Sequence, residues 1–137
     1  MADTFTFELV SPEKLLFSKP VVMATVPGEK GEYGVLAGHI PMITTIKAGV
    51  IQIYAEEGTT VTERIFVAGG FAEVTQTRFT VMAEEAIPVA NLNRAEIQEQ
   101  IKTLDAQISA AADASEGDRE ALRVRQDVLA AKLQAAA

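Results

Sequence analysis

The most informative segment of the chain lies between residues 31 and 41 and has the sequence Gly31-Glu32-Tyr33-Gly34-Val35-Leu36-Ala37-Gly38-His39-Ile40-Pro41. It joins three glycines, the only histidine and a proline within eleven residues. Glycine accepts turn conformations that other residues avoid, and proline fixes its own φ. We therefore expect a glycine-punctuated loop with a well-defined backbone that presents Glu32 and His39. Nothing catalytic can be built from this segment alone.

The composition of the whole chain narrows the classes of protein that it fits. It has 137 residues, 48% of them hydrophobic, which is typical of one or two small globular domains. The absence of cysteine excludes disulfides, thiolate chemistry and cysteine-based metal sites. The net charge of -7 argues against nucleic acid or anionic lipid as a direct partner. We expect no signal peptide, no transit peptide and no membrane span, since no apolar run reaches ~18 residues.

Up to about residue 86, apolar and polar residues alternate with a period of two, which is typical of half-buried strands. The clearest case is the run in which Phe5, Phe7 and Leu9 alternate with polar residues. Further strands are predicted at 21–26, 50–54, 60–67, 71–74 and 79–83. Turns are predicted at Pro27-Gly28, Glu56-Glu57-Gly58 and Thr75–Arg78, with a bulge or break at Gly69-Gly70. Short strands at this spacing predict a β-sandwich or flattened barrel over residues 1–88.

After Pro88 the period changes to 3.6, and residues 89–137 predict an antiparallel two-helix hairpin. Asn93 with Glu96, and Ser115 with Asp118, resemble helix N-caps on either side of a turn at 113–117. An apolar stripe follows the first cap at Ile97, Ile101, Leu104, Ile108 and Ala111. A thinner stripe, diluted by alanine, follows the second cap at Ala121, Leu122, Val128, Leu129 and Leu133. So small a unit needs support from the β domain or from another protein.

Two groups of polar residues are candidates for a functional role, and both leave alternatives open. His39 is the only imidazole, so it cannot form a histidine metal cluster; a structural role in the loop and a contact with another protein both remain. The glycines do not match a phosphate-binding loop or a dinucleotide fingerprint. The last helix is locally basic, and its cations are either a solvated face or a contact for an acidic partner. These cations are Arg119, Arg123, Arg125 and Lys132.

Four stretches, in order and spacing, resemble the epsilon-subunit family of bacterial F-type ATP synthases. They are Phe7-Glu8-Leu9-Val10-Ser11-Pro12, the glycine segment 31–41, Val67-Ala68-Gly69-Gly70-Phe71-Ala72-Glu73-Val74, and Val81-Met82-Ala83-Glu84-Glu85-Ala86. The resemblance implies a flattened β-sandwich of about ten short strands, followed by a helical hairpin. It also implies a non-catalytic rotor subunit without a cofactor, which couples proton flow to ATP synthesis.

The same resemblance implies the partners and the location of the chain. It implies contacts with the gamma subunit and the c-subunit ring, at the cytoplasmic face of the bacterial inner membrane, with membrane association only through the complex. Gly31, Glu32 and Tyr33 match the segment that meets the c ring. The residues that match the junction of gamma and the ring are Ser11, His39, Ile40, Pro41 and Met42. In some members the hairpin blocks ATP hydrolysis, so Arg119, Arg123, Arg125 and Lys132 are candidates for an inhibitory contact with the alpha and beta subunits.

One departure from the family concerns nucleotide binding. Some members bind ATP through an Ile/Leu-Asp-x-x-Arg-Ala motif, where this chain has Leu92-Asn93-Arg94-Ala95-Glu96-Ile97. Asn93 replaces the aspartate, and the Arg-Ala pair comes two residues early, which argues against ATP binding. The alternative function, an ATP-sensing regulatory module, would require heat or stabilisation on addition of Mg-ATP. A third function, a small acidic hydrolase, would require an activity that His39→Ala abolishes.

Overall fold

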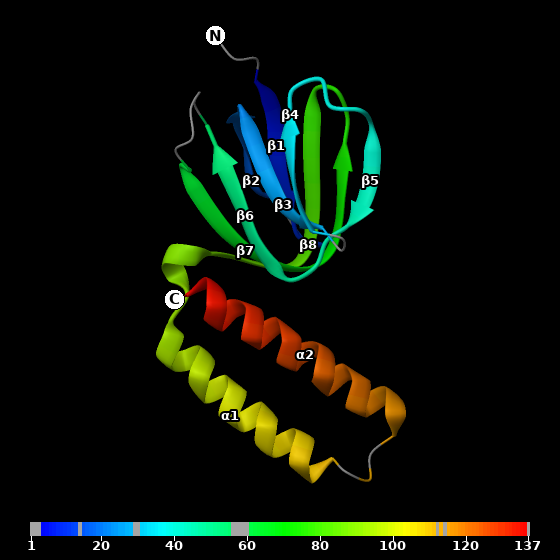
Figure 1. Cartoon of the computed structure of the whole chain (residues 1–137), viewed down its shortest axis with the longest axis vertical. Coiled ribbons are helices and arrows are strands. Elements are labelled where there is room, and N and C mark those ends of the chain that lie inside the picture. The colour runs from blue at the N-terminus through cyan, green and yellow to red at the C-terminus, as the bar shows by residue number, and fades with distance from the viewer. Residues whose placement is uncertain are drawn as a thin grey trace. The chain divides into compact units, whose positions relative to one another are not determined.

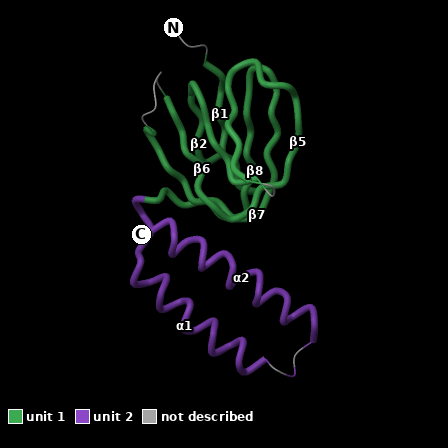
Figure 2. Tube along the Cα trace, viewed as in Figure 1, with its two compact units in different colours: residues 1–89 green, residues 90–137 purple. Residues whose placement is uncertain are grey.

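The structure is a computed structural model that describes residues 4–13, 15–28, 31–55, 61–111, 113 and 115–136. The chain divides into two compact units, residues 1–89 and 90–137, and each is described by itself (Figure 2). The predicted turn at Glu56-Glu57-Gly58 lies outside the described residues. In the part of the chain that the structure describes, no helix is long and apolar enough to cross a membrane.

The first unit contains eight strands in the described residues (Figure 1). They are β1 (Phe5–Val10), β2 (Leu15–Val21), β3 (Met23–Gly28), β4 (Gly31–Leu36), β5 (Met42–Thr45), β6 (Gly49–Tyr54), β7 (Glu63–Val74) and β8 (Arg78–Pro88). The strand order is β2-β1-β8-β7-β6-β3-β4, and β5 pairs with β7 beside this path. All neighbours are antiparallel except β1 and β8, which are parallel.

The β-sandwich is confirmed, with eight described strands where the resemblance implies about ten short ones. The difference arises at β7 and β8, which are long and pair with each other along their length. The first part of β7 pairs with β6 and its second part with β5, so one strand serves both layers. Of the two expectations for Gly69-Gly70, a bulge or a break between strands, the break is wrong. Both glycines lie within β7 at positive φ, 69° and 135°, and bend it without ending it.

The core of the first unit lies between the two layers. The alternation predicted for β1 is confirmed, since Phe5, Phe7 and Leu9 are buried and their neighbours are half-buried. The ring of Phe7 makes edge contacts with Phe17 and Phe79 at centroid distances of 5.7 Å. The cluster continues through β3, β6, β7 and β8, and all its members belong to residues 5–86. The first unit therefore has a complete apolar core of its own.

A short 3₁₀ helix, η1 (Val89–Asn91), spans the boundary between the units, and the second unit contains α1 (Arg94–Ala110) and α2 (Glu116–Ala135). Both predicted caps are confirmed: the Asn93 side chain accepts from the amide of Glu96 at 3.1 Å, and Ser115 accepts from Asp118 at 3.2 Å. α2 begins at Glu116, so Gly117 lies in the helix and not in the turn as predicted.

The apolar stripes of the hairpin are only partly buried. On α1, Ile97 and Leu104 are buried and the other members of the predicted stripe are half-buried. On α2, Leu129 is buried, whereas Ala121, which was expected in the stripe, is exposed. A side-chain hydrogen bond from Gln126 to Asp105, 3.4 Å long, also joins the two helices. The hairpin is thus a unit with few large buried side chains.

Candidate functional site

The segment predicted as one loop, residues 31–41, is a strand followed by a short connection. Residues Gly31–Leu36 form β4, which pairs with β3 from Gly28↔Gly31 to Met23↔Leu36. Only the connection from Ala37 to β5 is irregular. The expectation of a single loop is wrong. Tyr33 and Val35 point inward and alternate with exposed residues, as in a strand, and Gly34 does not interrupt this alternation. Since a strand rises ~3.3 Å per residue, Glu32 and His39 lie at opposite ends of β4.

The two glycines that frame β4 have the conformational role that was expected of them. Gly31 has φ 125° and Gly38 has φ 78°, values that residues other than glycine rarely adopt. The amide of Gly38 donates to the carbonyl of Gln76 at 3.0 Å, so the connection is held against the β7–β8 turn. The backbone of this connection is therefore well defined, as predicted.

His39 lies in the connection with its ring hydrogen-bonded locally. Its amide donates to the carbonyl of Leu36 at 3.2 Å, and Nδ1 donates to the carbonyl of Ile40 at 2.7 Å. A carbonyl can only accept, so Nδ1 is the donor in this contact. Within the described residues, no three His, Cys, Asp or Glu side chains gather in a way that could hold a metal ion. The arrangement fits a structural or contact role for His39.

The three residues matched to the c ring lie at the start of β4. Glu32 is exposed, and its strand partner is Pro27. Tyr33 points inward, packs against the core and hydrogen-bonds through its hydroxyl to the Thr44 hydroxyl of β5. Thus Glu32 is presented to solvent from a strand that Tyr33 fixes to the core.

The five residues matched to the gamma junction are not brought together. Ser11 directly follows β1, at the level of Ala83 and Gly70, because Val10 pairs with Met82 and Met82 with Phe71. His39, Ile40 and Pro41 precede β5, at the other end of the sheet, where Met42 pairs with Val74. One continuous sheet nevertheless joins the two ends.

Between these two ends, the sheet carries an apolar row that the sequence did not reveal. The register places Phe71, Met82 and Val10 side by side on β7, β8 and β1, and Leu15 of β2 opposite Val10. Their chain neighbours Ala72, Val81 and Leu9 are buried, so the row is on the outer face. Phe71 is 43% exposed and Leu15 is 56% exposed. We call these four residues the outer row.

A second group of exposed apolar side chains lies around the β4–β5 connection. Leu36, Ile40 and Ile43 are 55%, 78% and 69% exposed. Ile43 pairs with Glu73 on β7, one pleat from Phe71, so this group borders the outer row. Contiguous exposed apolar side chains are typical of protein interaction sites. One sequence pattern could have predicted the outer row: β1, β7 and β8 carry apolar residues at outward positions in addition to those at inward positions.

The four cations of α2 do not share one face of the helix. Successive helical residues turn by ~100°, so Arg119 and Arg123 share one face, while Arg125 and Lys132 lie on roughly the opposite one. Arg123 contacts Glu116 and Glu120 at 2.8 Å each. Hydrogen bonds to Glu116 first, and then to Glu120, raise the pKa of Arg123 above its usual value. Lys132 is buried, at 5% exposure.

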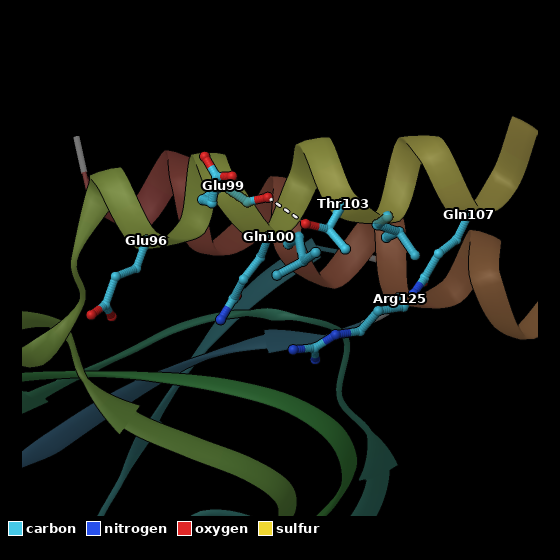
Figure 3. A pocket seen from close by; sticks show the side chains of 8 residues that line it. Glu96, Glu99, Gln100, Thr103, Gln107 and Arg125 are labelled. Atoms are coloured by element: carbon cyan, nitrogen blue, oxygen red, sulfur yellow. Dashed lines mark hydrogen bonds between the residues drawn. The ribbon is translucent and has the colours of Figure 1, made fainter.

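A groove on the hairpin tests the idea of a nucleotide site (Figure 3). Its lining includes Glu96, Glu99 and Arg125 around the apolar Leu104 and Leu129. Two carboxylates and one guanidinium give this lining a net negative charge, which disfavours a polyphosphate. Near its end, the Asn93 side chain caps α1. The lining of the groove therefore carries one more negative than positive charge.

Comparisons with known proteins show which family the chain belongs to. The family model described as "ATP synthase, Delta/Epsilon chain, beta-sandwich domain" matches residues 4–89. The chain is 52% identical to the ATP synthase epsilon chain of Rhodospirillum centenum, over 97% of this chain and 92% of that protein. It is 48% identical to the ATP synthase epsilon chain of Paramagnetospirillum magneticum, over 100% and 98% of the two chains.

Solved structures show the same fold. A chain in the structure of the Euglena gracilis mitochondrial ATP synthase is similar with a TM-score of 0.78 and 22% identity, over 97% of this chain and 81% of that one. A chain of the central stalk and c ring of the Tetrahymena thermophila enzyme is similar with a TM-score of 0.62 and 12% identity, over 99% and 98%. At these identities the likeness supports the architecture.

Proposed function

This chain belongs to the delta/epsilon-chain family of ATP synthases, and on that premise we propose that it is a non-catalytic rotor subunit of the central stalk. It would couple rotation of the c ring to ATP synthesis in a proton-translocating complex. The family membership rests on the match over residues 4–89 and on relatives that are similar over nearly the whole chain. The finer statements rest on the surfaces described above.

The outer row is the observation that carries the proposal. Phe71 and Leu15 are exposed at the two sides of Met82 and Val10, on a sheet whose opposite face is already buried in the core. Strands lie ~4.8 Å apart, so four neighbouring positions span roughly 14 Å, enough to seat an apolar element of a partner. We assign this face to the gamma subunit, with Ser11 at one end and Ile43 at the other side.

The c ring would be contacted at a different place, through the start of β4. Glu32 is exposed beside Gly31, on a backbone fixed by pairing with β3. A carboxylate on a fixed backbone can pair with a cation while losing little conformational entropy. His39, Ile40, Pro41 and Met42, at the other end of β4, would contact the same rotor assembly. Contact with the ring and with gamma would hold the chain at the cytoplasmic face of the bacterial inner membrane as a peripheral subunit.

A regulatory role for the hairpin is a further part of the proposal. Few large side chains are buried between α1 and α2, and alanine is frequent in α2, so the hairpin has high helix propensity and weak packing. An element of this kind can exchange between two arrangements at little cost. Its contact with the alpha and beta subunits would use either the Arg119 and Arg123 face or the Arg125 face, but not both at once.

Binding to gamma tests the core of the proposal. The full chain and gamma are mixed and separated by size-exclusion chromatography, and the affinity is then measured by interferometry. We expect a complex, and we expect Phe71→Asp to weaken it by more than about tenfold, as for other central apolar contacts. Val124→Asp is the matched control, because Val124 is 53% exposed on α2, outside this face.

Three results would contradict this assignment. Absence of any complex between the natural chain and gamma would refute the rotor function itself. A complex that Phe71→Asp leaves intact would refute the assignment of the outer row to gamma. Equal losses with Phe71→Asp and Val124→Asp would indicate a general effect of an added charge, and the outer row would again have no special role.

A further inference from the structure

We propose that the hydrogen bond between the hydroxyls of Tyr33 and Thr44 is a positioning contact. It would hold the β4–β5 connection, with the exposed side chains of Leu36, Ile40 and Ile43, in the conformation that the rotor partner binds. This inference rests on the proposed function, and it assigns a role to Thr44 and a second role to Tyr33. Neither residue need touch the partner for this role.

The first step of the argument is that the two strands flanking the connection are not paired with each other. β4 pairs with β3, and β5 pairs with β7, and among the described strands no backbone ladder joins β4 to β5. The hydroxyl oxygen of Tyr33 lies 2.5 Å from Oγ1 of Thr44, eleven residues later in the chain. This side-chain contact therefore closes the stretch of chain that contains the connection.

The second step is that both ends of the contact are anchored. The ring of Tyr33 is half-buried and packs against the core, and a Cβ added to Gly28 would lie 3.0 Å from two of its ring carbons. Thr44 pairs with Ala72, which is fully buried. Beyond β5, the bridge Gly28↔Ile46 and the hydrogen bond from Lys47 to Pro27 tie the chain to β3. The hydroxyl contact lies between that bridge and the β4–β5 connection, so it holds the ends of β4 and β5 that face the connection.

The third step concerns what depends on that distance. Within the connection, the backbone hydrogen bonds from Gly38 to Gln76 and from His39 to Leu36 fix the turn itself. They do not fix the spacing of β4 from β5, on which the separation of Leu36 and Ile43 depends. A partner that covers Leu36, Ile40 and Ile43 together requires one arrangement of the three, and a preformed arrangement lowers the entropic cost of binding.

The fourth step separates positioning from simple stability. Tyr33 and Thr44 are both half-buried, so water can replace a missing hydroxyl, and the fold keeps its core. Tyr33→Phe and Thr44→Val preserve shape and remove only the hydrogen bond. Tyr54→Phe is the matched control, because Tyr54 is the other tyrosine and its hydroxyl makes a 3.4 Å contact with Gln52 of its own strand.

The experiment measures two properties of the full-length chain and its variants. The first is the affinity for a gamma–c-ring complex lacking this subunit. The second is amide hydrogen exchange at Gly38 and His39, measured on the free chain. The variants are Tyr33→Phe, Thr44→Val, the double variant, Tyr54→Phe, and Thr44→Ser, which retains a hydroxyl. Thermal melts establish that all of them are folded.

We expect Tyr33→Phe and Thr44→Val each to weaken binding by about three- to tenfold, which is the range for one lost hydrogen bond. We also expect both variants to speed amide exchange at Gly38 and His39. The double variant should bind no more weakly than the weaker-binding of the two single variants, because Tyr33→Phe and Thr44→Val remove the same contact. Thr44→Ser and Tyr54→Phe should behave like the natural chain.

Two patterns would overturn the inference while leaving the rotor function intact: natural binding by Tyr33→Phe and Thr44→Val, or equal loss with Tyr54→Phe. Failure of the natural chain to bind would count against the proposed function instead. Amide exchange would then still decide the positioning role, since unchanged exchange in Tyr33→Phe and Thr44→Val would refute it.

Discussion

Gly70 of β7 lies so close to the backbone of Met82 on β8 that a Cβ on Gly70 would be 1.8 Å from the carbonyl oxygen of Met82. Gly70 also has φ 135°, in a region that other residues rarely adopt. The bend at Gly69-Gly70, after which β7 pairs with β5 instead of β6 along the same edge, lies at this close approach. Met82 belongs to the outer row, so the bend and the proposed gamma face share one strand pair.

Gly70→Ala should therefore destabilise the first unit severely. The methyl group meets backbone that cannot give way, and the positive φ adds strain, so we expect a loss of about 3 kcal/mol or more. Denaturant unfolding measures the loss. Gly34→Ala is the control, because the nearest atom to its added Cβ is the flexible side-chain sulfur of Met23 at 3.8 Å. Equal stability of the two variants would show that the bend tolerates a side chain.

Ser115→Ala should weaken the start of α2. The Ser115 hydroxyl accepts from the amide of Asp118, and replacing such a cap costs about 1 kcal/mol. Circular dichroism at 222 nm during thermal unfolding should show earlier loss of helix. Ser109→Ala, at the other side of the turn and within α1, should have a smaller effect because Ser109 does not cap a helix. Identical melting of the natural chain and Ser115→Ala would contradict the prediction.

Suppression of ATP hydrolysis should depend on one arginine face only. The enzyme core containing gamma is assayed with the full chain and with a chain ended at Val89, which retains the whole apolar core. We expect only the full chain to suppress hydrolysis. Arg119→Ala with Arg123→Ala is compared with Arg125→Ala, since the two faces are roughly opposite. If neither chain suppresses hydrolysis although both bind, the hairpin does not regulate the enzyme.

The charge on Arg123 should not vary across ordinary pH. Its pKa is raised, so its stabilising pairing with Glu116 and Glu120 is complete below its usual pKa and is lost only as pH rises through the raised value. Between about pH 6 and 9, the difference between Arg123→Gln and the natural chain should therefore stay constant with pH. This applies both to the suppression of ATP hydrolysis and to the melting temperature. A pH-dependent difference in that window would mean that other groups titrate with Arg123.

Mg-ATP should not bind to the hairpin. The carboxylates of Glu96 and Glu99 repel a polyphosphate, and Arg125 is the single cation of the groove lining. Isothermal titration of the full chain should give no heat beyond dilution, and Mg-ATP should not raise the melting temperature. The double variant Glu96→Gln with Glu99→Gln tests the reason, because weak binding that appears only there would point to repulsion by these carboxylates. Saturable binding to the natural chain would instead favour the ATP-sensing alternative.

Much of the local structure could be predicted from the sequence because it depends on nearby residues. The alternation around Phe5, Phe7 and Leu9 predicted β1, and the pairs Asn93–Glu96 and Ser115–Asp118 predicted both caps. Period and capping involve residues a few positions apart, so the chain determines them directly. The glycines between Gly31 and Leu36 predict a loop, but the segment is a strand, as the alternation of Tyr33 and Val35 indicates.

The tertiary structure alone decided how distant residues meet. Val10, Met82 and Phe71 form a row only because three strands pair in one particular register, and shifting one strand by a single residue would turn its side chains to the other face. The same pairing separates Ser11 from His39. Tyr33 of β4 reaches Thr44 of β5 although these two strands are not paired with each other. Register and packing follow from burial summed over the whole chain, which no local pattern records.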